Sequence, residues 1–147
     1  MSRALAVVLA AGAGCLVGIQ APVNARLAQA IGRIPAATFS FVVGTVALVA
    51  ILAFAGGGFG SFAHLGRAPW WALLGGLLGG IFVVVALTTV KTLGASGLTA
   101  AVIAGQLAIS LVIDRFGLLG IARAPVGASR IVGLVLLVAG VVLVVRR

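Results

Sequence analysis

Long apolar runs dominate the chain, and short stretches rich in Gly, Pro or basic residues separate them. Within each run the apolar residues are continuous and do not alternate at every second position, which favours transmembrane helices over a transmembrane barrel. Five runs approach the ~20 residues that an α-helix needs to cross a ~30 Å hydrocarbon core. The pattern predicts an all-α integral membrane protein with one domain, residues 1–147, and five transmembrane helices at approximately 4–21, 35–55, 69–90, 92–113 and 129–146.

Three prolines mark expected helix boundaries. We expect helices to begin at Pro35 and Pro69, because the first turn of a helix does not use the N–H that proline lacks. Pro22 has two interpretations. Either the first helix ends before Pro22 and a polar loop follows, or the helix continues with a kink or break, a device by which transporters expose backbone groups to a cavity.

Composition supports the membrane interpretation. Hydrophobic residues make up 63% of the chain and charged residues 7%, whereas soluble domains average about 25% charged residues. The formal net charge of +9 comes from basic residues at the ends of apolar runs, where lipid headgroups anchor them. They form no cluster with interleaved aromatic residues, so the lipid bilayer and not nucleic acid is the expected partner. Cys15 is alone, and neither a metal nor a cofactor is expected.

The basic residues also bear on orientation. Five crossings put the two ends of the chain on opposite sides of the membrane, and we name the N-terminal side A. Side A then carries Arg3, Arg67, Arg115, Arg123 and Arg130, and side B carries Arg26, Arg33, Lys91, Arg146 and Arg147. Because the Lys and Arg difference between sides sets orientation, this equal division predicts dual topology and an antiparallel dimer.

A few polar side chains lie within or beside the apolar runs, where lipid tolerates them only with a partner or a cavity. Gln20 and Asn24 are four residues apart and share a face if the first helix continues. Ser40 lies early in the second run. Gln106, Ser110 and Asp114 recur every four residues and form a polar stripe, which suits a wet vestibule or interhelical hydrogen bonds.

Asp114 is the only carboxylate side chain in the sequence and follows the fourth run directly. We interpret it as a marker of the membrane surface, ion-paired with Arg115 or Arg130. A role as a coupling carboxylate is the alternative. Close helix packing is predicted elsewhere, at the overlapping GxxxG pairs Gly75/Gly79 and Gly76/Gly80.

Several stretches in order, "IQAPVNARLAQAIG", "ATFSFVVGT", "PWWALLGGLLGG", "GASGLTAAVIAGQLAISLVIDRFGLLG" and "SRIVGLVLLVAGVVL", resemble the YdcZ-type family of the drug/metabolite transporter superfamily. The resemblance covers essentially the whole chain. It implies a five-helix unit in the bacterial inner membrane, equivalent to half of a ten-helix transporter. Half-size members are expected to pair in opposite orientation, as homodimers or with a homologous subunit, and the fourth and fifth helices would contribute the contacts by analogy.

The resulting hypothesis is a small-molecule transporter that works as an antiparallel homodimer. Its binding site on the dimer axis would be lined by Gln20, Asn24, Ser40, Gln106 and Ser110 and would take a neutral polar or anionic solute. One alternative is a cation exporter of the small multidrug type, although no carboxylate lies near the centre of a run. Another is a membrane scaffold that transports nothing. An enzyme is not expected, because the sequence has no nucleophile–base pair, metal cluster or carboxylate pair.

Overall fold

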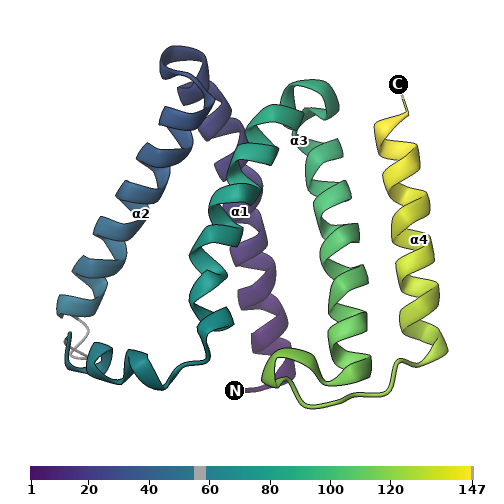
Figure 1. Ribbon diagram of the computed structural model, residues 1–147. Coiled ribbons are helices and arrows are strands. Elements are labelled where there is room, and N and C mark those ends of the chain that lie inside the picture. The colour runs from purple at the N-terminus through teal and green to yellow at the C-terminus, as the bar shows by residue number, and fades with distance from the viewer. Residues whose placement is uncertain (55–58, 147) are drawn as a thin grey trace. The chain divides into compact units, whose positions relative to one another are not determined.

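The computed structural model describes residues 1–54 and 59–146, and this part of the chain is helical without strands (Figure 1). The α-helices are α1 (Arg3–Ile31), α2 (Arg33–Phe54), α3 (Gly75–Phe116) and α4 (Ala128–Val145). Three short 3₁₀ segments are η1 (Phe59–Arg67), η2 (Trp70–Leu74) and η3 (Leu118–Gly120). Among the described residues, four helical segments are long and apolar enough to cross a membrane. The all-helical fold class is therefore confirmed.

Helix α1 continues through Pro22, so the predicted end at residue 21 is wrong. Proline removes only one backbone hydrogen bond, whereas leaving the helix within apolar surroundings would expose several backbone groups. The actual C-cap is Gly32, whose φ of 90° most residues avoid and whose N–H donates to the Ala28 carbonyl over 3.0 Å. Helix α2 begins directly afterwards at Arg33, which places Pro35 inside its first turn and not at its start.

The predicted third and fourth helices are joined in α3, preceded by η2 with Pro69 as its N-cap. The segment Trp70–Phe116 has 47 residues, roughly 70 Å as a straight helix and more than twice the hydrocarbon thickness. Gly94 interrupts it with φ 70° and ψ 171°, so the division falls at Gly94 and not at Lys91 as predicted. Each part is long enough to cross alone, and five crossings stay the prediction.

The fourth predicted helix differs from the structure at its C-terminal end, whereas the fifth nearly matches. Helix α2 is described to Phe54, and residue 55, its predicted last residue, lies outside the described residues. Helix α3 ends at Phe116, past the predicted residue 113, and the next residue, Gly117, has the left-handed φ of 66° that often ends a helix. Helix α4 agrees with its predicted range to within one residue at each end.

The chain forms two compact units, Met1–Lys91 and Thr92–Arg147, and a single domain stays a prediction. In the first unit, α1 and the first part of α3 run in the same direction and α2 runs against them (Figure 1). Their core lies where α1 ends and α2 begins, because small side chains there let the helices approach closely. The core residues are Ala36, Ala37, Val83 and Leu87, with Ala25, Leu27, Ala28, Phe82 and Val84 packed around them.

In the second unit, the loop after α3 folds back over the end of that helix. The N–H of Ala124 donates to the Asp114 carbonyl over 2.8 Å, and the Arg123 guanidinium donates to the Arg115 carbonyl over 2.9 Å. These bonds satisfy carbonyls that the last turn of a helix leaves free. They also hold Arg123 against the end of α3, and the division of basic residues between the two sides of the membrane stays a prediction.

Candidate functional site

Asn24 is the only buried polar side chain among the described residues, with 6% of its surface exposed. The Ser40 hydroxyl on α2 donates a hydrogen bond of 2.5 Å to its Oδ1. Asn24 precedes Ala28 by one helical turn, and Ser40 follows Ala36 by one turn, so each lies on the face that its helix turns toward the core. The packing of the alanines therefore brings these two polar groups together.

Gln20 and Asn24 line a small cavity of about 20 Å³ between α1 and α3, which is roughly the space for one water molecule. The other lining residues are apolar: Val17, Ala21, Phe82, Val83, Ala86 and Leu87. Ser40 engages the carbonyl oxygen of Asn24 and leaves the two N–H donors of that amide for another acceptor. The structure thus brings together three of the five predicted binding residues, Gln20, Asn24 and Ser40.

Gln106 and Ser110 belong to the second unit, where both are exposed on α3. Their spacing places them on one face of the helix, with Asp114 one turn further on. The predicted stripe is therefore present as a helical face. Both side chains are accessible to a ligand or to another chain.

Asp114 is ion-paired with Arg130 at the start of α4, with 2.9 Å between its Oδ2 and the arginine Nη1. Of the two partners that the sequence left open, Arg130 is the one found, whereas Arg115 offers its backbone carbonyl to Arg123. The side chains of Arg130 and Asp114 are 48% and 32% exposed. Exposed pairs of this kind stabilise a protein by about 0–1 kcal/mol.

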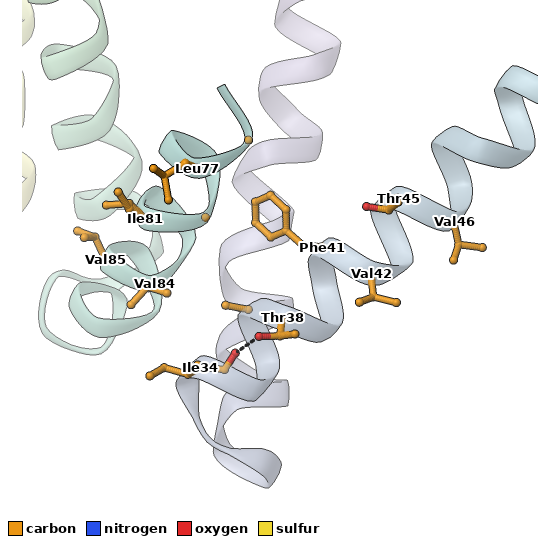
Figure 2. A pocket seen from close by; sticks show the side chains of 13 residues that line it. Ile34, Thr38, Phe41, Val42, Thr45, Val46, Leu77, Ile81, Val84 and Val85 are labelled. Carbon is orange, nitrogen blue, oxygen red and sulfur yellow. Dashed lines mark hydrogen bonds between the residues drawn. The ribbon is translucent and has the colours of Figure 1, made fainter. Parts of the chain in front are cut away.

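A larger groove of about 740 Å³ opens between α2 and the first part of α3 (Figure 2). Its walls are apolar apart from Thr38 and Thr45, and the Thr38 hydroxyl donates to the Ile34 carbonyl of its own helix. The apolar lining residues are Ile34, Ala37, Phe41, Val42, Val46, Gly76, Leu77, Gly80, Ile81, Val84 and Val85. Such walls suit hydrocarbon and offer no group for acid–base or metal chemistry.

Comparison with known families gives one match that spans nearly the whole chain. The family described as "Putative inner membrane exporter, YdcZ" matches residues 5–143. The chain belongs to the YdcZ family. No curated protein and no solved structure gives a significant match. The resemblance drawn from the sequence is thereby confirmed.

Membership in the YdcZ family, within the drug/metabolite transporter superfamily, makes this chain a multi-pass inner-membrane protein of a transporter family. Its long apolar helices agree with that location. A transporter must offer its solute polar groups inside an apolar bundle. In this YdcZ-family chain, the buried Asn24 with Ser40 and Gln20 is a group of polar side chains that the structure brings together within one unit.

The glycines predicted to pack helices divide into two kinds in the YdcZ chain. Gly79 faces the Phe41 ring, and a Cβ at that position would come within 3.3 Å of it. A Cβ at Gly75, Gly76 or Gly80 would meet nothing within 4 Å. Gly76 and Gly80 line the groove instead. The sequence does not predict this groove, because its pattern does not distinguish lipid-facing from groove-facing residues in a uniformly apolar helix.

Proposed function

We propose that this protein transports a small neutral polar or anionic solute across the inner membrane, and that Gln20, Asn24 and Ser40 form part of its binding site. One observation carries the proposal, the burial of the Asn24 amide in the apolar first unit with its N–H donors left for a further acceptor. Interhelical hydrogen bonds in membranes contribute only about 0.6 kcal/mol on average. Ligand binding therefore explains a buried polar pair in these apolar surroundings better than stability does.

The proposed roles follow from the chemistry of the groups. Ser40 orients the Asn24 amide by holding its oxygen. Asn24 and Gln20 then donate to the hydroxyl, carbonyl or carboxylate oxygens of a solute. The cavity of about 20 Å³ is too small for such a solute, so binding requires α1 and α3 to separate. Movement of one part of a bundle against another is the usual basis of alternating access.

The charge of the chain supports a neutral or anionic solute. Arg26 and Arg33 lie near the junction of α1 and α2, close in sequence to Asn24. The sole carboxylate side chain, Asp114, is taken by Arg130. Uncompensated positive charge raises the local concentration of anions and repels cations. The same ion pair weakens the alternative of a cation exporter, which needs a carboxylate free to exchange protons for its substrate.

We further infer an antiparallel homodimer, or a pair with a homologous subunit, in which Gln106 and Ser110 complete the site on the dimer axis. Two observations support it. The basic residues are predicted to be divided equally between the two sides of the membrane. The side chains of Gln106 and Ser110 are both exposed in the single chain. The opposite orientation would give the complete assembly the inverted halves typical of many secondary transporters.

A ligand screen on the purified chain tests the binding site. A solute that binds only the folded state raises the stability by about 2.7 kcal/mol at a hundredfold excess over its Kd. We expect neutral polar or anionic compounds among the hits, and we expect Asn24→Ala to abolish both the thermal shift and flux in proteoliposomes. Thr88→Val is the control, because the Thr88 hydroxyl bonds only the Val84 carbonyl of its own helix.

Gln106→Ala tests the second part of the proposed site. It should abolish flux as Asn24→Ala does, because both amides are proposed to bind the same solute. Normal flux in Gln106→Ala with loss in Asn24→Ala would confine the site to the first unit. Normal shifts and flux in both variants would refute the proposed site.

A further inference from the structure

The groove between α2 and α3 is about as long as the hydrocarbon of one lipid leaflet is thick. Along α2 its lining runs from Ile34 to Val46 (Figure 2), a rise of roughly 18 Å along the helix. Half of a ~30 Å hydrocarbon core is about 15 Å. Ile34, Val42 and Val46 are 69%, 54% and 63% exposed, so the groove is open along its length to the surrounding bilayer.

Helical spacing places one cation on the line of each wall, beyond the same end of the groove lining. Arg33 precedes Ala37 by one helical turn, and Ala37 lines the groove, so the two residues share a face of α2. On the other wall, Lys91 follows Val84 by two turns along α3 and ends the first unit. Neither has a carboxylate side chain to pair with, because Asp114 is the only one in the sequence and binds Arg130.

An apolar slot with unpaired cations at one end complements an anionic amphiphile. We propose that the α2–α3 groove binds one acyl chain of an anionic phospholipid, with the lipid phosphate held by Arg33 and Lys91. The tail alone confers no selectivity, since lipid hydrocarbon is as apolar as the groove walls. The selectivity comes from the headgroup, and a preference of about fivefold over a neutral lipid is expected for each cation engaged.

The size of the groove suits a small ligand such as one lipid tail. The groove holds about 740 Å³, within the roughly 300–1,000 Å³ typical of small-ligand sites. An anionic headgroup also suits the net charge of +9 that the chain carries.

Fluorescence quenching by brominated lipids tests the proposal in vesicles that contain the full chain. Trp70→Phe and Trp71→Phe remove the natural tryptophans, and Val42→Trp places one reporter in the groove. Brominated phosphatidylglycerol in unlabelled phosphatidylcholine is compared with brominated phosphatidylcholine at equal mole fraction. We expect stronger quenching by phosphatidylglycerol, with a relative affinity about fivefold or more above that of the neutral lipid.

Two charge variants identify the headgroup contact. Arg33→Gln should reduce the preference for phosphatidylglycerol by about fivefold. Arg67→Gln removes the same charge at the end of η1, on the predicted opposite side of the membrane, and should leave the preference unchanged. An equal loss in both variants would mean a general charge effect, and the assignment to the groove would be wrong.

A third variant tests the groove without changing charge. Gly80→Leu fills open space in the groove wall and should lower quenching by both lipids, whereas Gly12→Leu on α1 also has room and should not. Equal quenching of the reporter by the two lipids would overturn the proposal. A second outcome would also overturn the proposal. If neither lipid quenched the reporter and Thr45→Cys formed disulfides between copies, the groove would be a protein interface.

Discussion

The hydroxyl of Ser40 on α2 holds the side-chain oxygen of Asn24 on α1, sixteen residues earlier in the chain. This bond is the principal polar link between two helices whose other contacts are mostly alanine and leucine side chains. Its geometry fixes which end of the Asn24 amide is free to meet a ligand. The first prediction tests its contribution to stability.

Ser40→Ala should lower the free energy of unfolding by about 0.6–1.7 kcal/mol, because the Asn24 oxygen loses its partner in an apolar site. Asn24→Leu combined with Ser40→Ala should cost less than the two single changes together. Chemical unfolding in detergent micelles measures all three variants. Thr38→Val is the matched control, since the Thr38 hydroxyl bonds within its own helix. Strictly additive costs would show that the two residues do not interact.

Gly94→Ala should destabilise the protein by about 1–3 kcal/mol. At φ 70° and ψ 171°, Gly94 occupies a region of backbone conformation that is essentially restricted to glycine. Thermal unfolding of the purified variant measures the effect. Gly105→Ala is the control, because Gly105 lies within helical α3 with nothing within 4 Å of an added Cβ, and alanine favours a helix by up to about 1 kcal/mol there. Equal stability of the two variants would contradict the break at Gly94.

Asp114→Asn should cost at most about 1 kcal/mol of stability, because its partner Arg130 is half exposed and the pair is screened by solvent. Combining it with Arg130→Gln should add little further loss. Once a transported solute is known, its flux should persist in Asp114→Asn. A complete loss of flux in a variant that folds normally would instead identify Asp114 as a coupling group.

The equal division of charges predicts that copies insert in both directions. Two C-terminal reporters test this prediction, one active only in the cytoplasm and the other only outside it. We expect both reporters to show activity. Arg33→Gln leaves side A with the greater positive charge and should move the C-terminus out of the cytoplasm. Arg67→Gln should have the opposite effect. Unmixed orientation of the unmodified chain, unchanged in both variants, would exclude dual topology.

The apolar runs were sufficient to predict an all-helical membrane protein and the position of α4, because length and continuity of apolar residues decide these features. Two of the misplaced helix boundaries share a physical reason. The predicted ranges ended before Pro22 and divided at Lys91, yet α1 passes Pro22 and α3 passes Lys91. Positive φ at Gly32 and Gly94 marks the actual ends. Many glycines in this chain are helical, so composition could not identify these two.

The candidate site was only partly predictable. The spacing of Gln20 and Asn24 indicates a shared face without any tertiary information. The bond from Ser40 depends on how α1 and α2 cross. Small side chains at Ala36 and Ala37 permit this crossing, but their presence in the sequence does not predict it. The groove depends on where helices diverge, and no local pattern encodes that. Gln106 and Ser110 stay predictions as binding residues.

The continuation of α1 through Pro22 changes what the small cavity can offer a solute. Proline has no N–H, so the carbonyl of Gly18, one turn earlier, receives no bond from that position. This oxygen belongs to the same stretch of helix as Gln20 and Ala21, which line the cavity. Helix α1 therefore carries a backbone acceptor within two turns of the amide donors of Gln20 and Asn24, a combination that would suit solutes able both to donate and to accept hydrogen bonds, such as polyols and amides.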